Sequence, residues 1–187
     1  MKAIGIVGSP RKGGNTEILT EHTLKAIAEE GLDTELIRLS GLDIRPCNAC
    51  MVCKKEERCP IDDDLFPIYT KMKEVDAIIL ASPVYYSSAT ALLKAFMERT
   101  GYIAGSRRVF EGKVGGPLVV ARRAGKNFTH AELMFWFHIM GIIMPGSTYW
   151  NVATGREKGE VSGDEEGLAT AWKFGKNVAW LVKKLKA

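Results

Sequence analysis

Four cysteines lie within thirteen residues of this 187-residue sequence, and no other cysteine occurs in it. They are Cys47, Cys50, Cys53 and Cys59, in the pattern C-x2-C-x2-C-x5-C, and Pro60 follows the last of them. Thiolates are soft ligands that bind zinc and iron-sulfur clusters. Because two residues separate each of the first three cysteines, one loop can turn their sulfurs toward a common centre, and the fourth can close the site. The spacing therefore predicts a metal centre.

Three kinds of centre compete for this cysteine motif. The C-x2-C-x2-C-x3-C-P run of bacterial ferredoxins has nearly the same spacing and the same proline, which favours a [4Fe-4S] cluster. Since the chain has no further cysteine, Cys59 would complete the same cluster. Structural zinc usually uses two separate C-x2-C pairs, which this chain lacks. A disulfide or redox switch has no secretory signal to support it. Zinc and thiol chemistry remain as alternatives.

A second polar segment follows a buried strand predicted at residues 3–8. It runs Gly-Ser-Pro-Arg-Lys-Gly-Gly-Asn-Thr and leads into a predicted helix. Glycine backbone amides, side-chain donors, an arginine and a helix N-terminus together favour a phosphate. The segment matches neither the Walker A loop nor G-x-G-x-x-G, so a terminal phosphate monoester fits best. The alternative is a glycine-rich turn with a polar N-cap. The candidate phosphate-binding residues are Ser9, Arg11, Gly13, Gly14, Asn15 and Thr16.

Two further loops follow predicted buried strands. After the third strand come Pro83, Val84, Tyr85, Tyr86 and Ser87, whose backbone groups and aromatic rings could bind a flat heterocycle. The alternative is that the tyrosines pack as lids over the end of the sheet.

After the fourth strand come Ala121 and Arg122, followed by Arg123. The arginines could stabilise an anionic ligand, attract an acidic protein, or be solvated. Arg99, in the helix after the third strand, is expected to form an ion pair.

The elements that must position these loops alternate along the chain. Strands are predicted at residues 3–8, 34–39, 77–82, 114–121 and 142–145, and helices at 15–30, 64–74, 88–100, 127–140 and 165–186. Right-handed crossovers then give an α/β, doubly wound, five-stranded parallel sheet of flavodoxin-like order 2-1-3-4-5. Ligands bind such sheets beyond the carboxyl ends of the strands. We expect one domain over residues 1–187, with the cysteine loop at 40–63 inserted after the second strand.

Composition excludes several classes of protein. Hydrophobic residues make up 46% and charged residues 26%, with a net charge of +4. The charges are mixed in sign, so no basic stripe for nucleic acid is expected. No apolar run approaches the roughly 20 residues that span a bilayer. A strand begins at once, which leaves no room for a signal peptide, and a cytoplasmic location is expected.

The motifs together resemble a known family. The Gly8–Arg11 and Gly14–Thr16 segments, the Pro83–Tyr85 segment and the later Leu-Lys-x-Phe-x-Glu-Arg run are similar to flavodoxin-like NAD(P)H-dependent FMN reductases. With the cysteine motif, the chain resembles the iron-sulfur flavoproteins of anaerobic archaea and bacteria. The resemblance covers the chain up to about residue 125.

The resemblance implies two cofactors. FMN would place its phosphate at Ser9, Arg11, Asn15 and Thr16 and its isoalloxazine at residues 83–86. A [4Fe-4S] cluster would lie on the four cysteines. It also implies electron transfer from ferredoxin or a similar donor to a small acceptor, and a homodimer or homotetramer.

We therefore expect an FMN-dependent oxidoreductase without a catalytic amino acid, because the flavin performs the chemistry. Two alternatives remain. One is an NAD(P)H-dependent FMN or quinone reductase without a working cluster. The other is a non-catalytic electron carrier or redox sensor.

Overall fold

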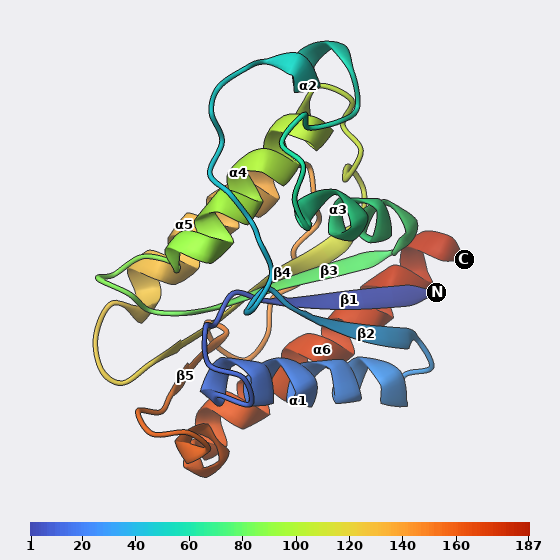
Figure 1. Cartoon of the computed structure of the whole chain (residues 1–187). Coiled ribbons are helices and arrows are strands. Elements are labelled where there is room, and N and C mark those ends of the chain that lie inside the picture. The colour runs from blue at the N-terminus through green and yellow to red at the C-terminus, as the bar shows by residue number, and fades with distance from the viewer.

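A computed structural model describes residues 1–187, and its centre is a five-stranded parallel sheet (Figure 1). The strands are β1 (Lys2–Val7), β2 (Asp33–Arg38), β3 (Ala77–Pro83), β4 (Val114–Ala121) and β5 (Val152–Thr154). Their order is β2-β1-β3-β4-β5, and every neighbouring pair is parallel. The doubly wound, flavodoxin-like fold predicted from the sequence is confirmed.

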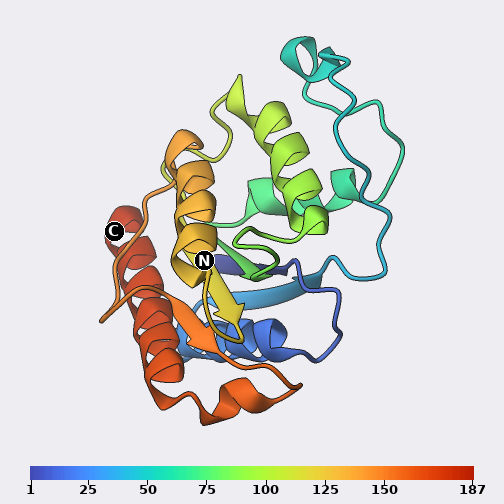
Figure 2. The ribbon, with the colours of Figure 1, turned by 90° about the vertical axis from the view of Figure 1, so that its left-hand side faces the viewer.

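Two layers of helices cover the sheet (Figures 1 and 2). On one face lie α1 (Asn15–Glu29) and α6 (Glu165–Lys186), and on the other lie α3 (Leu65–Glu74), α4 (Ala91–Gly105) and α5 (Lys126–Ile139). Each face has its own apolar core. Covering both faces buries every residue of β4 and nearly all of β1 and β3, which is why these strands read as continuous apolar runs.

The fifth strand is not where the sequence predicted it. Residues 142–145 form a single bridge, between Ile143 and Val114, and the strand proper is Val152–Thr154. The apolar segment does run beside the start of β4, where Gly115 N–H donates to the Ile143 carbonyl. Pro145 follows, and because proline has no N–H it cannot continue a hydrogen-bonded ladder. The chain pairs with β4 again only at Val119.

The helix predicted at residues 88–100 begins three residues later, at Ala91. Thr90 is its N-cap, and the Thr90 side chain accepts a hydrogen bond from the Leu93 N–H. Residues 85–88 form a tight turn before it, with reciprocal backbone hydrogen bonds between Tyr85 and Ser88. The turn delays the helix and leaves the loop after β3 free to face the end of the sheet.

The cysteine segment leaves β2 and extends past the C-terminal end of α4 (Figure 1). It contains one unpredicted helical turn, α2 (Val52–Lys55). Its two ends are joined, because Asp43 N–H donates to the Asp64 carboxylate and Asp64 N–H donates to the Asp43 carbonyl. The segment is therefore a closed loop on the side of the sheet that carries α4. No helix in the chain is long and apolar enough to cross a membrane.

Candidate functional site

The loops after β1, β3, β4 and β5 surround one cavity of 300 Å³, here named the strand-end cavity. Seven of the residues predicted from sequence line it: Ser9, Arg11, Asn15, Thr16, Pro83, Tyr85 and Arg122. Six others do not line it: Gly13, Gly14, Val84, Tyr86 and Ser87 lie in the same loops, and Ala121 is the last residue of β4. The topology thus brings together three loops that are far apart in the sequence, at the edge where ligands of this fold bind.

The loop after β1 forms the floor of the strand-end cavity. Ser9 is 5% exposed and Thr16 is 2% exposed, so both hydroxyl-bearing residues are held in fixed positions. Ser9 Oγ accepts a hydrogen bond from the Arg11 N–H at 3.2 Å. Behind them, a Cβ on Gly8 would lie 2.5 Å from Leu93 Cβ, so only glycine lets α4 pack this closely. The N-terminus of α1 adds positive potential to this floor.

Asn15 holds a neighbouring loop in place. Its Oδ1 accepts hydrogen bonds from Gly159 N–H at 2.8 Å and Val161 N–H at 3.3 Å, and its Nδ2 donates to the Glu157 carbonyl at 2.8 Å. Gly155 passes so close that a Cβ there would lie 2.7 Å from Asn15 Nδ2. The amide is therefore committed to the loop after β5, and Asn15 contributes to the cavity by positioning that loop.

Gly13 has a local partner as well. Its φ of +62° suits glycine, and its N–H donates to Glu17 Oε2 at 2.8 Å. Glu17 also pairs with Arg38 at 2.8 Å. The Arg38 guanidinium and the Gly13 N–H hold the pKa of Glu17 below its usual value, although burial opposes them. This amide is thus bound to a buried carboxylate in the structure.

Positive charge gathers at the strand-end cavity. Arg11, Arg122 and Arg156 line it, and Arg11 Nη1 donates to the Arg156 carbonyl at 3.1 Å. The sequence reading missed Arg156 and Gly155 because it placed the fifth strand too early. With the strand at Val152–Thr154, the Gly-Arg-Glu-Lys run would have been recognised as a loop at a strand's carboxyl end. Three arginines with buried hydroxyl-bearing residues suit an anion such as a phosphate.

The loop after β3 contains an unusual turn. Tyr86 and Ser87 have φ values of +50° and +61°, the left-handed values that a type I′ turn needs at both central positions. Such turns usually use glycine or asparagine, and left-handed values are costly for other residues. The Tyr86 side chain is fully exposed. Gly125 lies beneath the turn, where a Cβ would be 2.9 Å from Ser87 Oγ.

All four cysteines line a second cavity of 370 Å³, here named the cysteine cavity. Its other walls come from the cysteine loop itself and from the C-terminal half of α4, through Glu98, Arg99, Tyr102 and Ile103. Ala49 and Met51 have φ values of +57° and +62°, and these left-handed residues bend the loop around the cavity. The loop thus curls so that all four sulfur-bearing residues face one space.

The four thiols are free, and Cys50 is exposed while the others are half-buried. Burial raises the pKa of the Cys53 thiol, and the charges of Cys47, Cys50 and Cys59 raise it further. The thiols are therefore near enough to influence each other. No three side chains of histidine, cysteine, aspartate or glutamate lie close enough together to hold a single metal ion. A thiolate set that surrounds a larger group, with each sulfur on a different metal atom, needs no such convergence.

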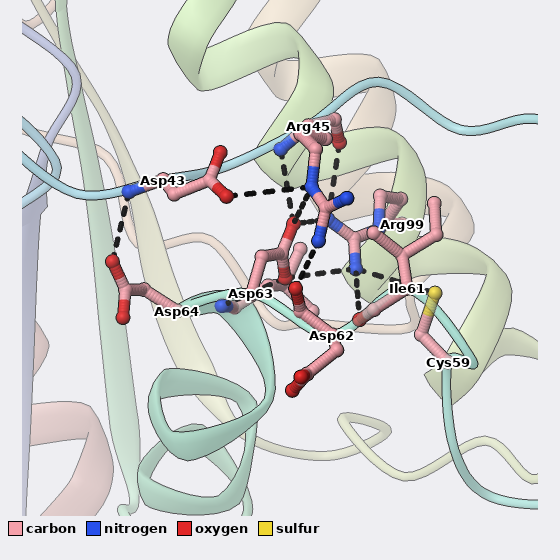
Figure 3. A network of polar contacts seen from close by, with 9 residues as sticks. Asp43, Arg45, Cys59, Ile61, Asp62, Asp63, Asp64 and Arg99 are labelled. Carbon is pink, nitrogen blue, oxygen red and sulfur yellow. Dashed lines mark hydrogen bonds and ion pairs between the residues drawn. The ribbon is translucent and has the colours of Figure 1, made fainter.

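Arg99 and Asp63 form a buried ion pair beside the cysteine cavity (Figure 3). Both side chains are 1% exposed. Burial would raise the pKa of Asp63, but hydrogen bonds from Arg99 and from the Arg45 and Leu65 amides outweigh it and hold the pKa below its usual value. The predicted ion pair of Arg99 is confirmed. Its partner could not be read from the sequence, because Asp62, Asp63 and Asp64 are consecutive.

The two cavities share no lining residue. They are joined by α4, since Leu93 packs behind the strand-end cavity and Tyr102 lines the cysteine cavity. Nine residues of helix correspond to about 13 Å along its axis. Within one chain, the two sites are therefore held apart by a rigid element.

A doubly wound sheet of this order, with an anion-suited cavity at the strand ends, defines a flavodoxin-like protein. The profile of the family "NADPH-dependent FMN reductase" matches residues 1–157. The chain therefore belongs to this family, among its iron-sulfur flavoproteins, and is an FMN-dependent oxidoreductase.

Curated relatives agree with this assignment, and solved structures agree with the fold. An iron-sulfur flavoprotein of Methanocaldococcus jannaschii is 42% identical over 193 residues, covering 100% of both chains. An iron-sulfur flavoprotein of Methanosarcina thermophila is 38% identical over 148 residues, covering 78% of each chain. Among solved structures, RosB with a bound flavin phosphate intermediate has a TM-score of 0.78 at 18% identity, covering 100% of this chain and 80% of that one. A WrbA-like flavodoxin of Agrobacterium tumefaciens has a TM-score of 0.71 at 16% identity, covering 98% of both.

Proposed function

We propose that this protein passes electrons between a donor such as ferredoxin, a [4Fe-4S] cluster on its four cysteines and FMN, and delivers them to a small acceptor. The observation that carries the proposal is the pair of cavities in one chain, one lined by four free cysteines and one by arginines and buried hydroxyl-bearing residues at the strand ends. We take residues 1–187 as one domain that carries both sites, with residues 40–63 inserted in it.

The residues of the strand-end cavity fit FMN. Ser9, Thr16 and Arg11 would hold the phosphate at the N-terminus of α1, with Arg156 as a second cation. Asn15 would act indirectly, by holding the loop that carries Arg156. A terminal phosphate carries about two negative charges near neutral pH, which suits a cavity with arginines on several sides.

The isoalloxazine would lie against the loop after β3. Pro83 and Tyr85 line the cavity and offer apolar contact, and Arg122 offers positive charge from the loop after β4. When bound, FMN supplies the ability to take up electrons singly or in pairs. The chain's own residues then orient the ring and balance its charge, so no amino-acid acid or base is needed.

The residues of the cysteine cavity fit a [4Fe-4S] cluster. Four thiolates are available, and the wall beside them is largely apolar, with Pro60, Ile61, Tyr102 and Ile103. An apolar shell limits solvent access and influences the reduction potential of a metal centre. When bound, such a cluster supplies single-electron transfer. The clustered free thiols also fit a reducing compartment, so we propose a cytoplasmic location.

The helical turn α2 in the cysteine loop carries two exposed lysines. Lys54 and Lys55 form no ion pair in the structure, whereas the acidic residues that follow them are paired, Glu56 with Arg58 and Glu57 with Lys73. Complementary charge steers association between electron-transfer partners. An acidic donor such as ferredoxin would fit this part of the loop, and electrons would enter at the cluster.

We further propose a homodimer or homotetramer. Phe128, Phe135 and Ile139 lie on one stripe of α5 and are 73%, 73% and 76% exposed. Large apolar side chains that are exposed together usually mark a protein interface. Because the two sites of one chain are held apart by α4, the cysteine loop of one subunit could serve the flavin of another. Light scattering of the wild type and of Phe135→Lys tests the oligomer: the variant should have a smaller mass.

Anaerobic purification tests the main proposal. We expect about four iron and four sulfide atoms per chain, broad visible absorption that bleaches on reduction, and release of FMN on boiling. Release of FAD, or of no flavin after reconstitution, would contradict the flavin assignment. Protein that holds FMN but no iron, and that oxidises NAD(P)H rapidly, would be a two-electron reductase. Protein that cycles electrons but turns over no small acceptor would be a carrier or redox sensor.

A further inference from the structure

The largest fully buried side chain of the protein is a charged one, Arg99. It lies on α4, six residues beyond Leu93, and is 1% exposed. A buried guanidinium is costly unless charge and hydrogen bonds compensate it. Arg99 contributes nothing to the strand-end cavity, so its burial serves another part of the molecule.

Every side-chain hydrogen bond of Arg99 goes to the cysteine loop (Figure 3). Nη1 donates to the Arg45 carbonyl at 3.0 Å and to the Asp63 carboxylate. Nη2 donates to the other carboxylate oxygen of Asp63 at 3.0 Å, to the Ile61 carbonyl at 3.4 Å and to Cys59 Sγ at 3.3 Å. The guanidinium therefore joins both ends of the loop and one of its sulfurs.

This contact makes the four cysteines unequal. Cys59 is the one cysteine whose sulfur accepts a hydrogen bond from a charged side chain. Cys47 Sγ accepts one from the backbone N–H of Ala49, at 3.4 Å. Arg107 also reaches the loop, but it donates to the carbonyl of Cys53. One thiolate of the set, on a half-buried residue, thus lies next to a permanent positive charge whose own side chain is buried.

We propose that Arg99 is a positioning residue that sets the reduction potential of the cluster through Cys59, and that Asp63 limits its effect. The inference rests on the proposed function. A cluster gains one negative charge when it accepts an electron, and a cation hydrogen-bonded to one of its thiolates favours that form. Arg99 therefore raises the potential. Asp63, which shares the same guanidinium, cancels part of the positive charge and lowers it.

A purely mechanical role makes a different prediction. If Arg99 only ties the ends of the loop together, its replacement changes loading of the cluster but leaves the potential of a loaded cluster unchanged. If Arg99 acts by charge, Arg99→Gln and Asp63→Asn shift the potential in opposite directions, although both weaken the same ion pair. Opposite shifts from two variants that break one contact have no mechanical explanation.

The test is a dye-mediated anaerobic redox titration of the full protein, followed by visible and electron paramagnetic resonance spectra. Iron, sulfide and FMN are counted for each variant. Arg99→Gln should shift the cluster potential to a more negative value, Asp63→Asn to a more positive one, and Arg99→Lys should lie between Arg99→Gln and the wild type. The flavin in the same sample is an internal control whose potential should stay constant.

Arg45→Gln is the matched control. The Arg45 side chain pairs with Asp63 and Asp43 but reaches no sulfur, and its bond to Arg99 uses only its carbonyl. Its cluster potential should stay near that of the wild type. Loaded variants of Arg99 and Asp63 with wild-type potentials, or shifts in the same direction, would overturn the inference. The inference would also be overturned if Arg99→Gln, Arg99→Lys and Asp63→Asn all failed to hold a cluster, because Arg99 would then serve only to hold the loop in place. Wild-type protein without iron and sulfide would overturn the proposed function itself.

Discussion

The strand-end cavity and the cysteine cavity are built in opposite ways. The first is assembled by topology: four strands end at one edge of the sheet, and each adds a few residues from its loop. The second is assembled by one continuous loop that closes on a single helix, with Arg99 and Asp63 between them. A site of the first kind depends on the whole sheet. A site of the second kind depends on the loop and one ion pair, so each should be separable from the other.

The two sites nevertheless share one structural feature, a left-handed backbone at residues other than glycine. Five residues other than glycine have positive φ values, and four of them lie in these two loops: Ala49, Met51, Tyr86 and Ser87. Left-handed backbone costs on the order of 1–3 kcal/mol for such residues and tends to occur at functional sites. In the cysteine loop the bends turn sulfurs inward. In the loop after β3 they turn Tyr86 outward, next to the strand-end cavity.

The largest expected effect is a complete separation of the two sites. Cys50→Ser should abolish or convert the cluster while the protein stays folded and keeps its FMN, because the cysteine loop contributes nothing to the strand-end cavity. Iron, sulfide and flavin counts on the same sample measure this. Lys55→Ser, an exposed position in the same loop, is the control and should keep both cofactors. Loss of FMN together with the cluster in Cys50→Ser would show that the two sites are structurally one.

Mild acid should destabilise the protein through a buried histidine of α5. His130 is 7% exposed, its Nε2 has no partner, and burial lowers its pKa to about 4. The unfolded chain, with an ordinary pKa near 6.5, therefore binds the proton more readily between pH 6.5 and 4. The contribution of His130 to the free energy of unfolding is fully present above pH 6.5. It falls by up to about 3 kcal/mol as the pH drops to 4. The free energy of unfolding should fall less over this range for His130→Phe.

Carboxylates also titrate in that range, so the informative quantity is the difference between the two proteins. His138, which is exposed on the same helix, is the matched control, and His138→Phe should follow the wild type. Parallel curves for wild type and His130→Phe would show that His130 is as easily protonated in the folded protein as in the unfolded one.

A smaller effect is expected from one arginine of the strand-end cavity. Arg11→Ala should weaken FMN binding by roughly 1.5–3 kcal/mol, the usual value of a hydrogen bond to a charged group. Riboflavin, which lacks the phosphate, should bind the variant and the wild type almost equally. Titration of apoprotein with each ligand, followed by flavin fluorescence, measures the difference. Equal losses for both ligands would mean that Arg11 acts through the fold, for example through its bond to the Arg156 carbonyl.

The smallest effect concerns the turn after β3. Tyr86→Asn should stabilise the protein by about 0.5–1 kcal/mol, because asparagine tolerates a left-handed backbone better than tyrosine does. The exposed ring has little packing to lose. Denaturant unfolding measures the gain, and Tyr102→Asn, an exposed tyrosine within a helix, should give no such gain. A destabilised Tyr86→Asn would indicate that the ring makes contacts that outweigh the strain.

The strand-end cavity was easier to predict than the cysteine cavity. Buried parallel strands are read from apolar runs such as Ala-Ile-Ile-Leu-Ala, and the order of the strands then places their loops at one edge. Seven predicted residues consequently line one cavity. The prediction of the short edge strand was wrong. Three residues with one fully buried side chain carry almost no hydrophobic pattern, whereas the segment before Pro145 has a clear one. For the same reason, Arg156 was not predicted to line the strand-end cavity.

The cysteines themselves were obvious from their spacing, but the support of their loop was not. Arg99 belongs to a helix with ordinary periodicity, and its partners lie 36 to 54 positions away. Nothing in a single sequence says which of three consecutive aspartates turns inward. The hydrogen-bond partners of Gly13 and Asn15 could not be predicted from the sequence either. Gly13 bonds to Glu17 and Asn15 bonds to the loop after β5, and packing determines both contacts. Residue types predict a chemistry, whereas long-range contacts decide which atoms remain free for it.

The hydrogen-bonded stem between Asp43 and Asp64 has a consequence for how such a chain can evolve. Because the two ends of the segment already touch, a short turn could replace everything between them without moving a strand, and the entropy of closing a loop grows only slowly with its length. Arg99 would then lose all of its side-chain hydrogen-bond partners, since each of them lies between Arg45 and Asp63. A lineage that discards the segment therefore has no partner left for an arginine at position 99, and the two changes should be inherited together.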